Sequence, residues 1–323
     1  MNHKSQPQPT SNIKSTRDGV GQALVELGRT NPRVVVISAD LASSTRVDLF
    51  KQEFPQRFFE VGVAEQHAAG LAAGLAMAGK IPFMASFAVF SPSLNWGVIR
   101  TSICLPNLPV KIIGGHTGLA TGPDGATHQS LEDIALMRCL PHMIVVSPSD
   151  GAEAYQATLS LANTRGPAYI RVTRPDTKPI KFQQDFALGK MRTVLYGNQA
   201  IILSHGYLLQ TAIDAAKSLA KNGLKVGVIN CHTIKPLDEE LLLQVCQTAK
   251  ALITLEDHQM IGGLGSAVAE VISQRQIKIP FKILGVNDQF GESGPPEELY
   301  CKHGLTSKQV AEVILKLLTK KHR

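Results

Sequence analysis

The chain of 323 residues has no closely spaced cysteines, no long uninterrupted apolar run and no collagen-like or repeat-like segment. Its five cysteines are widely spaced and none forms a CxxC pair, which argues against a zinc site or a disulfide framework. The first ten residues, MNHKSQPQPT, contain no apolar segment of the kind found in secretory signals. The longest apolar stretch, residues 61–78, is interrupted by Glu65, Gln66 and His67, which favours a packed helix over a bilayer span. We therefore expect a cytoplasmic protein with no membrane partner.

The chain carries a net charge of +7, but this excess is spread over both halves of the sequence. The only local basic run is the C-terminal tail, residues 316–323. A short basic tail at the end of a helix is explained by the helix dipole, so we expect no nucleic-acid partner. With 44% hydrophobic and 18% charged residues, the composition is that of a globular protein long enough for two domains.

Short β-branched apolar runs alternate with helical patterns along most of the chain. Strands are expected at residues 34–38, 82–85, 110–113, 143–147 and 169–172, and helices at 64–78, 131–138 and 151–162. Strands separated by helices indicate a mostly parallel sheet, because parallel neighbours need crossover connections. After a Pro-rich interruption between Arg174 and Arg192 the alternation resumes, with strands expected at 200–203, 226–230 and 252–255 and helices at 208–221, 239–248 and 266–274.

These patterns predict an α/β protein made of two consecutive three-layer α/β/α domains, the first with a mostly parallel sheet and the second smaller. The expected bounds are a disordered lead-in over residues 1–14, a first domain over 15–178, a linker over 179–192 and a second domain over 193–323. Open sheets of this kind bind ligands beyond the carboxyl ends of their strands. Polar or aromatic residues at those ends are Asp40, Phe87, His116, Asp124, His128 and Arg174 in the first domain and His205, His232, Glu256, Asp257 and His258 in the second.

Glu65 begins a predicted helix that otherwise consists mainly of alanine, glycine and leucine. Small side chains allow such a helix to pack closely against another element, so we expect the glutamate to be buried. Burial disfavours the ionised form of a carboxyl group, and such a group can exchange a proton with a ring nitrogen near neutral pH. Taken alone, the residue is better explained by the preference for acidic side chains at a helix N-terminus.

Four motifs, in this order and spacing, extend the interpretation. They are SADL at residues 38–41, GVAEQH at 62–67, SFAVF at 86–90 and HTGLATGPDGATHQ at 116–129. Together they make the chain, from about Ser15 to its end, resemble the C-terminal half of the thiamine-diphosphate transketolases. The resemblance implies a pyrimidine-binding domain followed by a transketolase C-terminal domain.

The resemblance also implies roles for single residues. Glu65 would hydrogen-bond N1′ of the thiamine diphosphate pyrimidine and so activate the cofactor. Phe87 and Phe90 would surround that ring, and Asp40 would lie near the cofactor and the substrate hydroxyls. His116, Asp124 and His128 would bind sugar hydroxyls or transfer protons. The sugar phosphate would be held by Arg17, Ser44, His116 and Arg174, since arginine binds phosphate as a planar, charge-assisted fork.

The chain contains no Gly-Asp-Gly motif, which in full-length transketolases belongs to a preceding domain that binds the diphosphate. The Mg²⁺ or Ca²⁺ that holds the diphosphate is therefore expected mainly on a separate partner subunit, with no metal ligand in this chain. This matches the second subunit of a split transketolase. Such a subunit is expected to dimerise through its pyrimidine-binding domain and to form an α2β2 assembly with the partner subunit. Its expected substrates are sugar phosphates.

The expected reaction is transfer of a two-carbon ketol unit from a ketose phosphate to an aldose phosphate. Residues 92–98 and Pro123 depart from the usual family pattern, which leaves open a transketolase specialised for an unusual ketose phosphate. The sequence also leaves open the beta subunit of a 2-oxo acid dehydrogenase, a deoxyxylulose-phosphate synthase fragment and a non-catalytic partner subunit. The glycine-rich residues 262–266 are expected to form a tight turn and helix start, because no Gly-Lys-Ser/Thr follows them.

Overall fold

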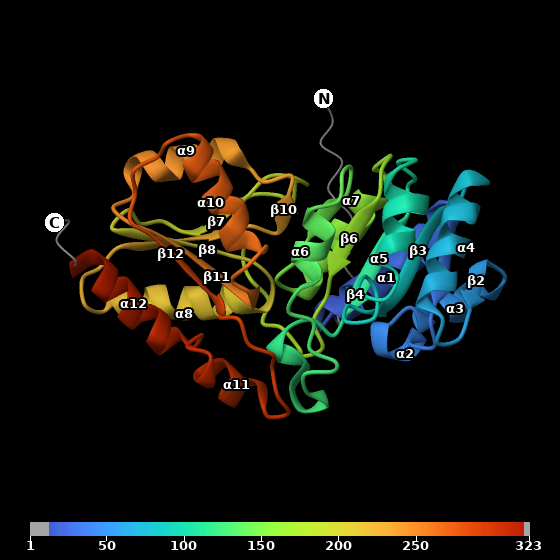
Figure 1. Cartoon of the computed structure of the whole chain (residues 1–323), viewed down its shortest axis with the longest axis horizontal. Coiled ribbons are helices and arrows are strands. Elements are labelled where there is room, and N and C mark those ends of the chain that lie inside the picture. The colour runs from blue at the N-terminus through green and yellow to red at the C-terminus, as the bar shows by residue number, and fades with distance from the viewer. Residues whose placement is uncertain (1–12, 320–323) are drawn as a thin grey trace.

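The computed structural model describes residues 13–319. The lead-in expected over residues 1–14 lies outside the described part except for its last two residues. Two α/β domains with mostly parallel sheets lie side by side, the N-terminal one in blue to green and the C-terminal one in yellow to red (Figure 1). The predicted fold class is confirmed. Within the described residues, no helix is long and apolar enough to cross a membrane.

The first domain is built on a sheet of seven strands. These are β1 (Val34–Ser38), β2 (Phe58–Glu60), β3 (Ile81–Phe87), β4 (Lys111–Gly115), β5 (Ile144–Val146), β6 (Ala168–Arg171) and β10 (Thr233–Lys235). Their order across the sheet is β10-β5-β6-β4-β3-β1-β2, and every neighbouring pair is parallel except β10 with β5. The carboxyl ends of the six parallel strands therefore meet at one edge.

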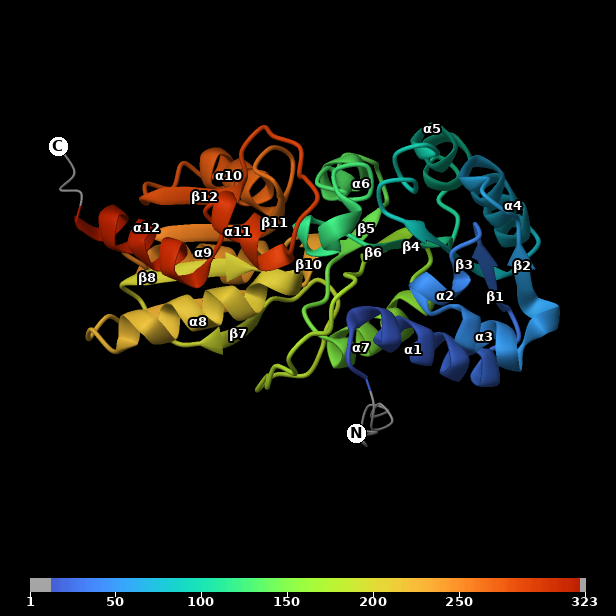
Figure 2. The ribbon, with the colours of Figure 1, turned by 90° about the horizontal axis from the view of Figure 1, so that it is seen from below.

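Helices cover both faces of this sheet (Figure 2). One face packs against α1 (Thr16–Thr30), α3 (Asp48–Glu53) and α7 (Gly151–Ala162), and the other against α4 (Glu65–Met77), the π-helix η2 (Ile99–Cys104) and α6 (Asp133–Arg138). Val36 of β1 belongs to the first core and the next residue, Ile37, to the second, as the alternation of side chains along a strand requires. Shorter elements are α2 (Ala42–Thr45), η1 (Pro55–Arg57), α5 (Trp96–Val98) and η3 (Leu119–Asp124).

The second domain has five strands, β7 (Arg192–Leu195), β8 (Ala200–Ser204), β9 (Val226–Asn230), β11 (Leu252–Gln259) and β12 (Phe281–Val286). Their order is β12-β11-β8-β9-β7, with only β7 antiparallel to its neighbour. Its helices are η4 (Gly206–Leu208), α8 (Leu209–Ala220), α9 (Glu239–Thr248), α10 (Leu264–Gln274), α11 (Pro296–Lys302) and α12 (Ser307–Thr319). The α8 and α12 helices pack on one face of the sheet, and α9 and α10 on the other.

Strand β10 joins the two domains, because it follows β9 of the second domain but pairs with β5 of the first. Its Lys235 ammonium donates hydrogen bonds to the carbonyl oxygens of Arg138 and Leu140 at the end of α6. The sequence pattern did not predict this strand. Its pairing fixes the second domain against the sheet that carries the predicted site.

The glycine-rich segment before α10 forms a turn and helix start, as expected. The Glu256 carboxylate accepts hydrogen bonds of 2.7 Å from the backbone N–H groups of Leu264 and Gly265. A Cβ atom at Gly263 would lie only 2.0 Å from Oε2 of that carboxylate, so glycine is needed for the close approach. The protein's own carboxylate thus fills the position at which a phosphate loop would bind an anion.

Candidate active site

Glu65 is the first residue of α4 and only 5% exposed. The hydroxyl of Ser86, on β3, donates a 2.9 Å hydrogen bond to Oε1 of the glutamate. Three alanines on the same helix, Ala68, Ala69 and Ala72, are buried, which lets α4 approach the sheet closely. Among the described residues, Ser86 is the one hydrogen-bond donor to this carboxylate, so Oε2 is left for a ligand.

Asn95 holds the backbone of Glu65 in place. Its side-chain amide donates hydrogen bonds to the Glu65 carbonyl oxygen (3.0 Å) and to the Ser91 hydroxyl (3.1 Å), and the residue is 1% exposed. The next residue, Trp96, donates its indole N–H to the carbonyl oxygen of Leu136. The segment that departs from the family pattern therefore supports the candidate catalytic glutamate, a function that sequence reasoning missed.

Four aromatic rings form a cluster that begins next to Ser86, the hydrogen-bond partner of Glu65. Phe87, directly after Ser86, stacks on His116 with ring centroids 3.8 Å apart, and on Phe90 at 6.0 Å. The rings of His128 and Phe90 are nearly perpendicular, at 77°, with centroids 5.5 Å apart. Four predicted site residues that are up to 41 positions apart in the sequence (87 to 128) are thus brought into contact.

His116 lies at the carboxyl end of β4 with a positive φ of 54° and is 4% exposed. Its Nδ1 atom is buried and has no hydrogen-bond partner among the described residues. Burial, assisted by the charges of Arg17 and Arg174, lowers the pKa of His116 to about 3. The ring is therefore neutral near pH 7 and can offer a ligand a donor or an acceptor, but no positive charge.

Two arginines lie near this histidine: Arg174 donates a 3.2 Å hydrogen bond to the carbonyl oxygen of Thr121, whose hydroxyl donates to the carbonyl oxygen of His116, and Arg17 contacts Arg174. Arg17, from the start of α1, donates hydrogen bonds to the carbonyl oxygens of Ser44 (2.8 Å) and Arg174 (2.7 Å). Arg174, beyond β6, forms a 3.0 Å ion pair with Asp124. The four segments predicted to hold an anion therefore converge, although Ser44 contributes its backbone carbonyl to the contact with Arg17.

Asp40 stands apart from these contacts. It is exposed, has a φ of 60°, and its backbone N–H donates a 2.7 Å hydrogen bond to the Glu60 carboxylate at the end of β2. No contact in the described part of the chain joins its side chain to Glu65 or to the aromatic cluster.

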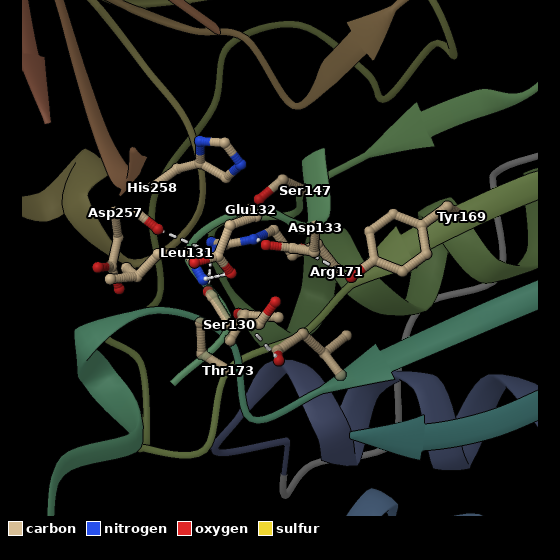
Figure 3. A network of polar contacts seen from close by, with 12 residues as sticks. Ser130, Leu131, Glu132, Asp133, Ser147, Tyr169, Arg171, Thr173, Asp257 and His258 are labelled. Atoms are coloured by element: carbon tan, nitrogen blue, oxygen red, sulfur yellow. Dashed lines mark hydrogen bonds and ion pairs between the residues drawn. The ribbon is translucent and has the colours of Figure 1, made fainter. Parts of the chain in front are cut away.

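Of the polar residues expected at strand ends of the second domain, four contact the first domain, whereas Glu256 accepts its backbone hydrogen bonds from α10. All five are buried, at 0% or 1% exposure: His205, His232, Glu256, Asp257 and His258. His205 Nδ1 shares a 2.9 Å hydrogen bond with the Ser147 hydroxyl of the first domain, and the Asp257 carbonyl oxygen accepts one from Arg171. Figure 3 shows the part of the domain interface around Arg171 and Asp133, with Asp257 and His258 of the second domain. Within residues 13–319, no group of three metal-ligating side chains could hold a metal ion.

Two family models match this chain. The model described as "Transketolase, pyrimidine binding domain" covers residues 13–179, and the one described as "Transketolase, C-terminal domain" covers residues 189–310. The two models follow each other along the chain and correspond to the two sheets described above.

Similar proteins are found along the whole chain. A protein of Methanocaldococcus jannaschii described as a transketolase C-terminal section is 40% identical over 310 residues, which cover 95% of this chain and 97% of that protein. The 6-deoxy-6-sulfo-D-fructose transketolase subunit of Clostridium sp. (strain MSTE9) is 37% identical and covers 95% of both chains. A solved structure described as a split gene transketolase, inactive beta4 tetramer, is 43% identical with a TM-score of 0.88, over 96% of this chain and 100% of that one.

Proposed function

This chain belongs to the transketolase family, and from that membership we propose that it is the pyrimidine-binding subunit of a two-chain, thiamine-diphosphate-dependent transketolase. In this proposal the assembled enzyme transfers a two-carbon ketol unit from a ketose phosphate to an aldose phosphate. The observation that supports it most directly is the buried Glu65 carboxylate. Ser86 donates a hydrogen bond to it, and the next residue, Phe87, stacks on His116.

The residues present fit the cofactor pyrimidine. A carboxylate with one oxygen left for a ligand suits a protonated ring nitrogen, and the rings of Phe87 and Phe90 suit the faces of an aromatic heterocycle. When bound, thiamine diphosphate supplies the nucleophilic carbon and the electron sink that ketol transfer needs. Glu65 would share a proton with N1′ of the pyrimidine, while Ser86 and Asn95 keep its side chain and backbone in position.

The charged residues of the site indicate how the substrate would bind. Arg17 and Arg174 would bind the terminal phosphate through charge-assisted hydrogen bonds, and Ser44 lies in the same corner. Neutral His116 would hydrogen-bond the sugar, because its ring cannot carry a second proton near neutral pH. Asp124 and His128, on the same loop, would contact the substrate hydroxyls, and Asp40 would approach the cofactor and substrate only in the assembled enzyme.

A partner subunit would supply the diphosphate site and the hard oxygen ligands that Mg²⁺ or Ca²⁺ prefers. Two names support this part of the proposal: "C-terminal section" for one relative and "inactive beta4 tetramer" for the related structure. We propose an α2β2 enzyme in which this chain dimerises through its first domain, with no activity of its own.

A ketose that ends in a sulfonate is a second candidate donor. The relative that supports it is named for 6-deoxy-6-sulfo-D-fructose, and a guanidinium pair binds a sulfonate as well as a phosphate. The same arginine pair argues against the beta subunit of a 2-oxo acid dehydrogenase, whose substrate has no phosphate to hold.

The test of the proposed function is ketol transfer by the chain alone and by the chain mixed with its diphosphate-binding partner, thiamine diphosphate and Mg²⁺. We expect turnover only in the mixture, because in this proposal the two halves of the cofactor site lie on different chains. Xylulose 5-phosphate and 6-deoxy-6-sulfofructose would be compared as donors with ribose 5-phosphate as acceptor. A complex that forms and binds the cofactor but transfers no ketol unit from either donor would refute the proposal.

Arg174→Gln is expected to raise KM for a phosphorylated donor about 10- to 100-fold, which corresponds to the loss of one charge-assisted hydrogen bond. Because Arg174 is partly exposed, the variant should fold normally. The control is a donor without a phosphate, L-erythrulose, whose KM should change less than about threefold. An equal increase for both donors would show that the variant disturbs the site in general, and the phosphate assignment would be wrong.

A further inference from the structure

Asp257, in the second domain, binds the loop of the first domain that carries the candidate substrate residues. We call residues 117–129 the substrate loop. The Asp257 carboxylate, on β11 and 1% exposed, accepts hydrogen bonds from the backbone N–H groups of Leu119 (2.9 Å) and Ala120 (3.4 Å). The Tyr300 hydroxyl donates a third, of 2.7 Å, to the same carboxylate. The first turn of η3 is therefore held by a side chain from the other domain.

The backbone of the substrate loop is shaped for this contact. Gly118, directly before η3, has a φ of 72°, a conformation that favours glycine. A Cβ atom at this position would lie 2.0 Å from Oδ2 of Asp257. Only glycine allows both the backbone conformation and the approach of the carboxylate.

The other end of the substrate loop is held by the second domain as well. The side-chain amide of Gln129 donates hydrogen bonds of 2.9 Å to the carbonyl oxygens of Gly122, within the loop, and Glu292, in the second domain. The Ser293 hydroxyl donates to the carbonyl oxygen of Pro123. A Cβ atom at Gly291 would lie 1.8 Å from Gln129 Oε1, so glycine again permits the approach.

Asp124 and His128 lie between these two attachment points. Asp124 ends η3, whose first turn Asp257 binds, and His128 directly precedes Gln129. The position of Asp257 is fixed in turn by the first domain, because Arg171, buried at 1% exposure, donates a 2.7 Å hydrogen bond to its carbonyl oxygen (Figure 3). A shift of the Asp257 side chain would therefore be transmitted to the residues that face the substrate.

We propose that Asp257 is a positioning residue of the transferase, an inference that rests on the proposed function. It sets the geometry of Asp124 and His128 without touching the substrate. The second domain thus acts on the reaction through the substrate loop. Misplacing reacting groups by about 1 Å can lower a rate about 100-fold, so loosening this attachment is expected to affect turnover more than binding.

The test compares Asp257→Asn with Glu256→Gln in the assembled enzyme. The two residues are neighbours on β11, both are buried, and each carboxylate accepts hydrogen bonds from two backbone N–H groups at a helix start. Only the amides bound by Asp257 belong to the substrate loop. We expect Asp257→Asn to lower kcat about 10- to 100-fold and Glu256→Gln to change it less than about threefold, at similar losses of thermal stability.

Two further measurements keep the result interpretable. Inhibition by inorganic phosphate should change less than kcat in Asp257→Asn, because Arg17 is anchored outside the loop, whereas Arg174 pairs with Asp124 within it. Ser293→Ala, which removes an exposed contact from the second domain to Pro123 in the middle of the loop, should also lower kcat. Equal kcat losses in Asp257→Asn and Glu256→Gln, or no loss in either, would overturn the proposal.

Hydrogen exchange separates this inference from the proposed function. In the chain alone, Asp257→Asn should speed exchange of the amides in residues 119–124, and Glu256→Gln that of residues 264–268. If the wild-type complex has no ketol-transfer activity, the proposed function and the role in turnover both fail. Unchanged exchange over residues 119–124 would show that Asp257 does not hold the loop, whatever the activity.

Discussion

Glu65→Gln in the assembled enzyme is expected to lower kcat by about 100- to 10,000-fold, the usual contribution of a positioned acid or base. The amide has the shape of the carboxylate and can still accept the hydrogen bond from Ser86, but it cannot exchange a proton with a ring nitrogen. The measurement is ketol transfer with the partner subunit, thiamine diphosphate and Mg²⁺ at saturating donor. Glu65→Ala should lose at least as much, since it also leaves the buried Ser86 hydroxyl without its acceptor.

The control is Glu312→Gln, which removes one carboxylate from the exposed side of α12. It should retain the activity of the wild type. Far-UV circular dichroism and the melting temperature would establish that both variants are folded. Turnover of Glu65→Gln within tenfold of the wild type would mean that Glu65 only begins a helix, and the catalytic assignment would have to be abandoned.

Arg171→Met is expected to lower the free energy of unfolding by about 3 to 5 kcal/mol at neutral pH, because it leaves a buried charge without its partner. Arg171 and Asp133 are 1% and 0% exposed and form a 2.8 Å ion pair. Tyr169 donates a 2.7 Å hydrogen bond to the same carboxylate, but it carries no compensating charge. Urea unfolding of the wild type and the variant measures the difference.

The loss should depend on pH in a defined direction. Burial alone would raise the pKa of Asp133, but the Arg171 charge and the hydrogen bonds to the carboxylate lower it below its usual value. A carboxylate with a lowered pKa stabilises the fold at every pH above its ordinary pKa of 3.8, and this contribution is lost only as the pH falls below that value. Between pH 7 and pH 5 the wild type therefore keeps the contribution. Without Arg171, burial favours the protonated carboxyl, so the difference between variant and wild type should narrow from pH 7 to pH 5.

Two further variants test the mechanism of that loss. Adding Asp133→Asn to Arg171→Met removes the uncompensated charge and should recover about half of the lost stability. Arg29→Met breaks the exposed Arg29–Glu53 pair, at 58% and 40% exposure, and should cost less than about 1 kcal/mol. A similar loss for Arg29→Met and Arg171→Met would contradict the argument from burial.

The local pattern predicted several elements to the residue. The helices α7 and α9 and the strands β1 and β9 begin and end where the sequence pattern placed them, and the other predicted strands differ by one to four residues at one end or both. Such elements are specified within their own segments, by apolar periodicity and by caps such as Asp150 and Asp238, whose side chains accept hydrogen bonds from the first turns of α7 and α9.

The candidate site was predicted in its residue types but not in its supporting contacts. The motifs contain Glu65 and the aromatic residues, and the family resemblance added the two arginines, because these side chains carry the chemistry. Ser86 and Asn95, which hold Glu65, were not singled out. Serine and asparagine are common in turns and strand ends, so their type alone does not mark them as partners of a carboxylate.

The sequence by itself determined the α/β fold class, the order of most elements and the identity of the groups that can carry charge and protons. Only the tertiary structure decided that β10 joins the sheet of the other domain and that Asp257 binds the substrate loop. These contacts join residues more than 80 positions apart, Val146 with Thr233 and Leu119 with Asp257. A local pattern specifies which face of an element is apolar. Long-range pairings depend on how whole domains pack against each other, and each short segment contributes only a small part of that packing energy.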